Sequence, residues 1–191
     1  MTDKLAVRVA RAPRCEITAI FQRHVSRRVV AVSGTTAGGR WAPTGSFPVL
    51  YLGRPIDSVV VEAYRHLVDS VEGMRRELVQ PRSLWTCSVS TTNVLDLRSA
   101  EVQRQLGLDG GALTTDVGDY KACQAVGRAA HQLAIHGILA PSATTLGETL
   151  ALFTQHLPSN EMPVLQNVEH WETLPADPRA PGLRIVGGEP T

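Results

Sequence analysis

The 191-residue sequence has few cysteines and no long apolar run. No segment approaches the roughly 18 uninterrupted apolar residues of a membrane helix. Residues 1–30 carry scattered arginines in place of the apolar centre of a signal peptide. Three cysteines, Cys15, Cys87 and Cys123, lie far apart with no C-x-x-C spacing, which indicates neither a disulfide framework nor a zinc site. The sequence therefore predicts a soluble, unexported protein of the reducing cytoplasm, without contact to a membrane.

Aromatic residues and net charge are also low. The chain contains 3 Phe, 3 Trp and 3 Tyr, and its 19 Lys and Arg against 18 Asp and Glu give a net charge of +1. Nucleic-acid binding depends on counterion release and on aromatic stacking, so direct nucleic-acid binding is not expected. Residues 1–28 are nevertheless locally basic and include Arg8, Arg11 and Arg14. This basic end predicts either a solvated flank or a docking surface for an acidic partner.

With 43% hydrophobic residues, the chain can bury a core as one domain. We expect a basic N-terminal flank over residues 1–15, a folded domain over 16–174, and a tail rich in Pro and Gly over 175–191.

The apolar pattern predicts strands and helices that do not alternate regularly. Strands are expected at residues 16–25, 47–52, 84–90, 93–97, 138–140, 149–155 and 163–174. Helices are expected from an N-cap at Asp57 to Leu78, from Ser99 to Leu106 before Gly107, and from Tyr120 to His136 with Gly137 at the C′ position. This order favours a mixed α+β fold over a doubly wound one.

One face of the helix expected over residues 120–136 carries mostly small side chains. These are Cys123, Val126, Gly127, Ala130 and Ala134. Such a stripe predicts that the helix packs very close to a neighbour. Residues 33–46 and 107–119 are expected to form long loops, which in compact domains are usually functional.

The loop from Gly34 to Trp41 has the glycine spacing of a P-loop, but Arg40 and Trp41 replace the lysine and the Ser or Thr of that motif. It is therefore interpreted either as a surface loop or as a glycine loop that presents Arg40 to a pyrophosphate. Glu62, considered by itself, is a solvated helix residue, and Ser142 a turn serine. The six histidines show no metal-ligand spacing, so no metal site is expected.

Several of these residues belong to five segments that occur in a familiar order. The segments are Phe21-Gln-Arg23-His24, Gly38-Gly39-Arg40-Trp41-x-Pro43, Pro48-Val-Leu-Tyr51-Leu52, Glu62, and His136-Gly137-Ile-Leu-Ala-Pro141-Ser142. Together they resemble the RES-domain family, which is named for its Arg, Glu and Ser residues and supplies toxins of bacterial toxin-antitoxin modules. Residues 123–131 are especially similar to the mycobacterial-type branch, which consumes NAD by phosphorolysis.

The resemblance implies a fold like that of ADP-ribosyltransferases, with a mixed sheet core and flanking helices. It also implies that NAD binds in a cleft as substrate, so no bound cofactor is expected. Cleavage of the bond between nicotinamide and ribose would pass ADP-ribose to inorganic phosphate. The expected partner is a helix-turn-helix antitoxin whose end plugs the cleft.

The resemblance also assigns roles to residues of this sequence. Glu62 and Arg40 would be catalytic, and Arg23, His24, Arg40, Tyr51 and Ser142 would bind NAD. A tyrosine is common in the family where His24 stands. Glu62 would stabilise the oxocarbenium-like ribose, and the arginines would orient the pyrophosphate.

Other functions remain open from the sequence. Water or a host protein would attack the same carbon as phosphate, which would make the chain an NAD glycohydrolase or a protein ADP-ribosyltransferase. A non-catalytic module that binds the antitoxin is a further alternative.

Overall fold

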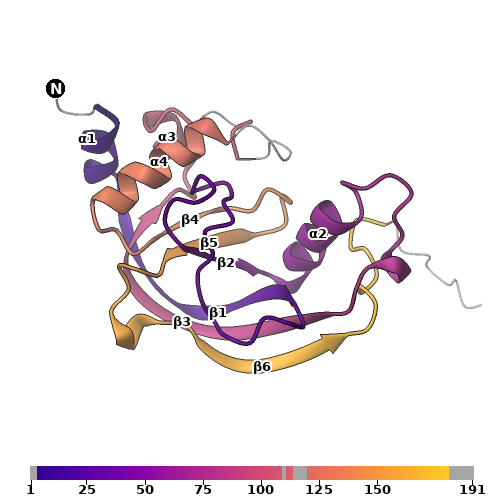
Figure 1. Ribbon diagram of the computed structural model, residues 1–191. Coiled ribbons are helices and arrows are strands. Elements are labelled where there is room, and N and C mark those ends of the chain that lie inside the picture. Colours follow the sequence, from indigo (N-terminus) through magenta and orange to yellow (C-terminus); the bar gives the residue numbers. More distant parts are fainter. Residues whose placement is uncertain (1–3, 109–110, 114–119, 181–191) are drawn as a thin grey trace, which may run out of the picture.

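Alternating apolar residues form one strongly curved sheet with helices on either side of it (Figure 1). The structure is a computed structural model that describes residues 4–108, 111–113 and 120–180. The strands are β1 (Arg14–Ser26), β2 (Val49–Arg54), β3 (Arg82–Asp96), β4 (Gly137–Pro141), β5 (Glu148–Phe153) and β6 (Val164–Trp171). The helices are α1 (Lys4–Arg11), α2 (Ile56–Leu67), α3 (Ala100–Gln105) and α4 (Lys121–Gln132), with 3-10 turns η1 (Arg76–Leu78) and η2 (Ser159–Glu161). The predicted mixed α+β class is confirmed.

The sheet closes on itself. Its strand order is β1-β2-β5-β4-β3-β6, and β1 pairs in addition with β3 along most of its length. Strands β1, β2, β5, β4 and β3 thus form a ring, and β6 extends the remaining edge of β3. The pairing of β3 with β4 is parallel, whereas the other pairings are antiparallel.

Strands β2, β4 and β5 are buried on both faces, which explains their almost continuous apolar sequences. Leu50 and Leu52 of β2 belong to one core cluster, together with Phe21 of β1 and Leu150 of β5. The residues that alternate with these along the strands, such as Phe153 of β5, point to the other face of the sheet and belong to a second core cluster, which includes residues of α4. The central strands therefore hold two layers of core in place, and α4 covers the second.

Helices α1, α3 and α4 lie together over one end of the curved sheet, while α2 lies apart at the other end (Figure 1). Helix α1 falls in the predicted basic flank, where no helix was expected. It buries Val9 in the core cluster that includes α4. Arg14 donates to the carbonyls of Val9 and Ala12, and Arg8 donates to the carbonyl of Gln105. Arg8 and Arg14 of the basic end are thus hydrogen-bonded to the backbone of the fold. The docking surface for an acidic partner stays a prediction.

The helix predicted from Asp57 to Leu78 is shorter than expected. Helix α2 begins at Ile56, with Pro55 at the N-cap position and Asp57 in the first turn, and it ends at Leu67. Beyond it, the Ser70 hydroxyl donates to the His66 carbonyl, and Gly73 has a φ of 72°. The apolar spacing of the sequence continues past Leu67. The helix nevertheless ends there, and the positive φ of Gly73 is not compatible with its continuation.

Two further boundaries were wrong. Gly137 is not the residue that ends α4, because Ala134 takes the positive φ of 52° and Gly137 already begins β4. A Cβ at Gly137 would lie 2.6 Å from the carbonyl oxygen of Ala151, so the glycine is required by strand packing. The two strands predicted at 84–90 and 93–97 are one strand, β3, with a positive φ at Asn93. The carboxylate of Glu161 holds this bend through the Thr91 and Thr92 hydroxyls.

The predicted close approach of the small-residue helix is confirmed. A Cβ built on Gly127 of α4 would lie 1.9 Å from the carbonyl oxygen of Trp41, far inside van der Waals contact. Trp41 is 1% exposed and follows Arg40 in the glycine loop. The absence of a side chain at Gly127 therefore lets α4 touch the backbone of this loop. Within the described residues, no helix is long and apolar enough to span a membrane.

The contact between Gly127 and Trp41 generates a test. In an exposed helix, Gly→Ala stabilises by up to about 1 kcal/mol. Here Gly127→Ala is expected to destabilise by about 1–3 kcal/mol, because the methyl group displaces the loop backbone. Urea unfolding measures the difference, with Arg128→Ala on the exposed face of α4 as the control. A stabilised Gly127→Ala variant would contradict the close contact.

Candidate active site

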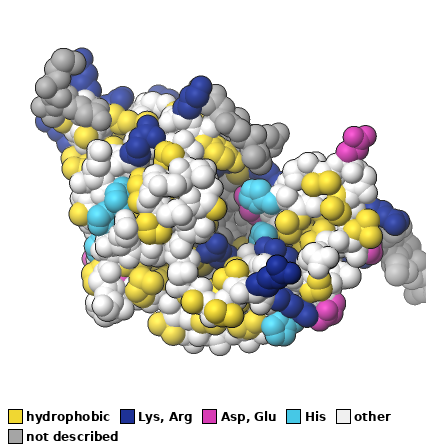
Figure 2. Space-filling model, viewed as in Figure 1, with side chains coloured by type: hydrophobic (Ala, Val, Ile, Leu, Met, Phe, Trp, Pro, Cys, Tyr) yellow, Lys and Arg dark blue, Asp and Glu magenta, His cyan; other side chains and the backbone are white. Residues whose placement is uncertain are grey.

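A cleft of about 600 Å³ lies between α2, the glycine loop, α4 and the adjoining ends of β1, β2 and β4. The molecular surface is hollowed beside α2, with basic and histidine side chains near the hollow (Figure 2). All six predicted site residues line this cleft: Arg23, His24, Arg40, Tyr51, Glu62 and Ser142. They come from five separate segments, which the closed sheet brings together.

Glu62 points its carboxylate into the cleft from the middle of α2. The opposite face of the helix packs Val60, Ala63 and Tyr64 into a core cluster with Leu84 of β3. Glu62 Oε1 lies 3.6 Å from Nε2 of His66, one turn further along the helix. The side chain of Glu62 is 39% exposed, and Oε2 is shielded from solvent without a hydrogen-bond partner among the described residues. The polar face of α2 therefore lines a cleft, as the resemblance required.

Three hydroxyl groups fasten the start of α2 to the end of β4. Ser58 Oγ donates to Ser142 Oγ at 2.9 Å, and both hydroxyls lie 2.9 Å from Oγ1 of Thr144. The Thr144 N–H also donates to Ser142 Oγ at 3.2 Å. Ser58 and Ser142 are almost fully buried. The Ser142 hydroxyl thus has its partners inside the protein, and it positions the helix that carries Glu62.

The glycine loop is held against β2 and α4 by backbone contacts. Tyr51 Oη accepts the Trp41 N–H at 3.1 Å, and a Cβ at Gly39 would lie 2.8 Å from the same oxygen. The side-chain amide of Gln124 in α4 donates to the Gly39 carbonyl at 3.0 Å. Burial raises the pKa of Tyr51 to about 12, so its hydroxyl stays protonated. These contacts fix the loop at the position from which Arg40 enters the cleft.

Arg40 is anchored on the side of the cleft away from α2. Its Nη1 donates to the Ala112 carbonyl at 2.8 Å, and its guanidinium lies 4.8 Å from the centre of the Tyr120 ring. Ala112 belongs to the loop predicted at 107–119, and Tyr120 directly follows this loop. Residues 109–110 and 114–119 of the loop lie outside the described residues. The long loop therefore contributes to the site through Ala112.

A second basic wall consists of Arg23, His24 and Arg82. His24 Nδ1 lies 3.2 Å from Nη2 of Arg82, and Arg23 Nη1 donates to the Ser33 carbonyl at 3.5 Å. Burial, with the charges of Arg82, His66 and Arg23, lowers the pKa of His24 to about 3. Burial also lowers the pKa of Arg23 and of Arg82. A neutral His24 that accepts at Nδ1 carries its proton on Nε2, where it is a hydrogen-bond donor.

Unpartnered polar atoms concentrate at this cleft. Within the described residues, four buried side-chain atoms have no hydrogen-bond partner. Three of them, Gln22 Oε1, Glu62 Oε2 and Arg82 Nε, belong to residues that line the cleft. Buried polar atoms in folded proteins are almost always paired, so such a cluster indicates a place for a polar ligand.

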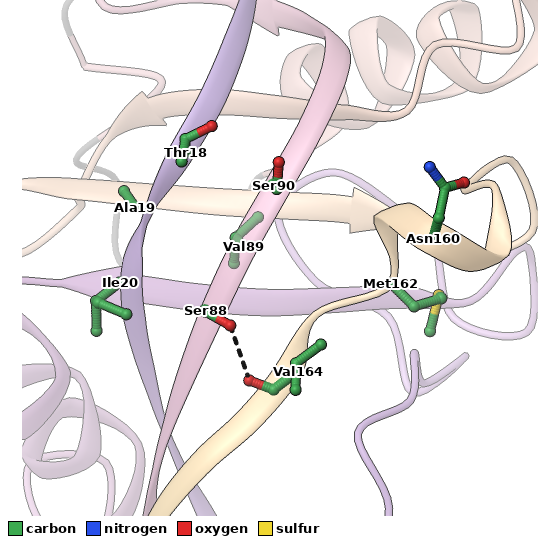
Figure 3. Close-up of a pocket in the computed structure, with 9 residues that line it drawn as sticks. All are labelled: Thr18, Ala19, Ile20, Ser88, Val89, Ser90, Asn160, Met162 and Val164. Atoms are coloured by element: carbon green, nitrogen blue, oxygen red, sulfur yellow. Dashed lines mark hydrogen bonds between the residues drawn. The ribbon is translucent and has the colours of Figure 1, made fainter.

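A second pocket, of about 370 Å³, lies on β1 and β3 beside η2 (Figure 3). It is lined by Thr18, Ala19, Ile20, Ser88, Val89, Ser90, Asn160, Met162 and Val164, none of which is ionisable. This pocket therefore lacks the acid, base and cationic groups that the cleft contains. Among the described residues, no group of three or more His, Cys, Asp or Glu side chains is placed to hold a metal ion.

Several cleft residues were not predicted. Gln22 and Gln124 lie inside segments that carry the family resemblance, so their positions could have been found from the sequence. Arg82 precedes an apolar strand and has no local signal, because only the pairing of β1 with β3 brings it to His24. Ser58 resembled any polar residue in a first helical turn.

Comparison with known proteins points to one family. The family model of the RES domain matches residues 15–174. The chain is 31% identical over 153 residues to the NAD(+) phosphorylase MbcT of Mycobacterium tuberculosis and to that of Mycobacterium bovis, which covers 78% of this chain and 81% of each relative.

A solved structure agrees with the sequence comparison. The crystal structure of the M. tuberculosis MbcT-MbcA toxin-antitoxin complex contains a chain that superposes with a TM-score of 0.77 at 28% identity. The match covers 88% of this chain and 93% of the other. The chain thus shares the fold of a chain in that complex, while the likeness to ADP-ribosyltransferases stays a prediction.

The burial of neutral His24 predicts a pH-dependent stability. Its pKa falls from the ordinary 6.5 to about 3 on folding, so the unfolded chain binds the additional proton between these values. The free energy of unfolding is therefore expected to rise with pH across this window, by up to about 1.4 kcal/mol per pH unit from this group. His24→Gln should flatten that slope in urea unfolding between pH 4.5 and 6.5. The control is His170→Gln, an exposed histidine outside the cleft, and equal slopes in wild type and His24→Gln would contradict the assignment.

Proposed function

Because the chain belongs to the RES domain family, we propose that it is the toxin of a toxin-antitoxin pair and cleaves the nicotinamide–ribose bond of NAD. The ADP-ribose group passes to inorganic phosphate, with NAD as substrate and not as a cofactor. The likeness to NAD(+) phosphorylases supports phosphate as the acceptor. The observation that carries the proposal is the presence of the Glu62 carboxylate and of arginines from two separate segments in one cleft.

Glu62 acts at the reacting carbon. As nicotinamide departs, positive charge develops on the anomeric carbon of the ribose. A carboxylate next to that carbon stabilises charge that exists only in the transition state. The unpartnered Oε2 of Glu62 is free to accept a ribose hydroxyl or to face the carbon. The leaving group already carries a positive charge, so it needs no proton from the protein.

The remaining residues bind and orient NAD. Arg40 and Arg23 enter from opposite walls and contact the pyrophosphate through charge-assisted hydrogen bonds. The Tyr51 ring lies against Gly39, and its hydroxyl accepts a hydrogen bond from the Trp41 N–H, which holds the ring in place. The ring therefore offers a surface on which the nicotinamide can stack. Ser142 acts through Ser58, whose helix carries Glu62, and is a positioning residue.

The partner of this toxin is an antitoxin, which we propose has a helix-turn-helix domain and an end that enters the cleft. The structural likeness to a toxin of a solved toxin-antitoxin complex supports such a partner. An antitoxin that plugs the cleft competes with NAD. Nicotinamide release should therefore fall as the antitoxin is added and recover with excess NAD.

The activity is tested by incubating the purified chain with NAD, with and without phosphate, and following nicotinamide and the ADP-ribose product by chromatography. Release that depends on phosphate, with a phosphorylated ADP-ribose product, is the expected result. Release without phosphate and with free ADP-ribose would make the chain a glycohydrolase. Release only when a host protein is added would make it an ADP-ribosyltransferase, and no release would leave a non-catalytic antitoxin-binding module.

Glu62 provides the sharpest test of the site. Glu62→Gln keeps the shape of the side chain and removes its charge, and we expect nicotinamide release to fall by about 10²–10³-fold. The free energy of unfolding should change by less than about 1 kcal/mol, because the residue lines a cleft and not the core. Glu72→Gln, at an exposed glutamate outside the cleft, is the matched control. Full activity of Glu62→Gln would refute this site assignment.

A further inference from the structure

Arg82 has no acidic partner among the described residues, although it is partly buried. Within the described residues, six other arginines form ion pairs with carboxylates: Arg27, Arg54, Arg76, Arg98, Arg104 and Arg179. Arg82 is half-buried, and among the described groups no carboxylate lies within 4 Å of it. Its Nη2 contacts the neutral His24, and its Nε is buried without a hydrogen-bond partner. A half-buried cation without a counter-charge is costly unless a bound anion compensates it.

The surroundings of Arg82 offer hydrogen-bond donors to such an anion. His24 accepts from Arg82 at Nδ1, which leaves an N–H on Nε2, and the Nε–H of Arg82 is unpartnered. Arg23 lines the same cleft and adds a second positive charge to it. A set of donors with a fixed guanidinium matches the oxygens of a phosphate group better than it matches a neutral molecule.

Two phosphate-containing groups take part in the proposed reaction: the pyrophosphate of NAD and the inorganic phosphate that accepts ADP-ribose. The arginines of the cleft indicate where each of them binds. Arg40 lies on the side of the glycine loop and α4, where it contacts Ala112 and Tyr120. Arg82 and His24 line the same cleft as His66 and Glu62, and His66 Nε2 lies 3.6 Å from Glu62 Oε1. Glu62 marks the carbon at which nicotinamide is replaced. An anion on Arg82 therefore shares the cleft with the reacting carbon, whereas Arg40 and Arg23 are the arginines that bind the pyrophosphate of NAD.

We propose that Arg82, with the Nε2–H of His24, forms the subsite for the phosphate that accepts ADP-ribose, and that Arg82 thereby selects phosphate over water. This inference rests on the proposed function and adds the site of its second substrate. An oxygen of hydrogen phosphate bonds to the anomeric carbon as the carbon–nitrogen bond breaks. The electron pair of that bond remains on the ring nitrogen, which gives neutral nicotinamide and ADP-ribose 1″-phosphate. No proton has to move at the reacting atoms.

The test separates the two substrates kinetically. Arg82→Met keeps an unbranched stem of four heavy atoms and removes the charge and the hydrogen-bond donors. We expect it to raise the KM for phosphate by about 10- to 100-fold, which corresponds to the loss of one or two charge-assisted hydrogen bonds. The KM for NAD should stay within about two-fold, as should any nicotinamide release without phosphate. Arg82→Lys, which keeps the charge and loses the planar fork, should fall between wild type and Arg82→Met.

Arg28→Met removes an exposed arginine outside the cleft and is the matched control. An unchanged KM for phosphate in Arg82→Met would overturn the inference. An equal rise in both KM values would also overturn it, because Arg82 would then bind the pyrophosphate of NAD. A purely structural role would lower kcat or stability without separating the two KM values.

Direct phosphate binding, measured by ³¹P NMR titration of wild type, Arg82→Met and Arg82→Lys, does not depend on turnover. If wild type releases no nicotinamide, the proposed function fails, while weaker phosphate binding by Arg82→Met still supports an anion subsite. If wild type and Arg82→Met bind phosphate equally, or neither binds it, the subsite is overturned whatever the activity.

Discussion

The contact between α4 and the backbone of Trp41 determines the geometry of one whole side of the cleft. A glycine at position 127 lets the helix reach the loop without an intervening side chain. Gln124, one turn earlier, binds the Gly39 carbonyl, and Tyr51 of β2 binds the Trp41 N–H from below. The loop also bonds to itself, because the Gly39 N–H donates to the Ala42 carbonyl at 2.8 Å and the Gly45 N–H donates to the Thr36 carbonyl at 2.8 Å. Arg40 is therefore placed by contacts within its own loop together with a helix and a strand.

The other side of the cleft depends on the start of α2. Within the described residues no side chain caps this helix by a hydrogen bond, and three hydroxyls instead connect its first turn to the end of β4. The same helix buries Ala63 and Tyr64 against β3 and β6, which leaves Glu62 facing the cavity. The two walls are thus built on different elements, and the closed sheet determines the distance between them. This arrangement is rigid enough to hold a carboxylate and several cations apart in one cleft.

Charge is distributed unevenly in this protein. The net charge is +1, and six of the described arginines outside the cleft form ion pairs with carboxylates. In the cleft, cations outnumber the single carboxylate of Glu62, and burial keeps His24 neutral between them. A cleft with these properties attracts anionic substrates while it stabilises positive charge at one point. Both features suit the proposed transfer of ADP-ribose from NAD to phosphate.

The sequence by itself predicted the fold class, most strands and the close packing of α4, and its family resemblance picked out six residues that all line one cleft, while their roles stay predictions. Alternating apolar residues, a stripe of small side chains and motifs in a fixed order are local or linear signals, so they can be seen without coordinates. Tertiary structure alone decided where α2 ends, that residues 82–96 form one strand, and that the Ser142 hydroxyl bonds to Ser58 at the start of α2. It also decided that Arg82 meets His24, because that contact arises from pairing between strands 58 residues apart in the chain. Long-range pairing leaves no periodic trace in a single sequence, and for this reason the place of Arg82 beside His24 was found only in the folded protein.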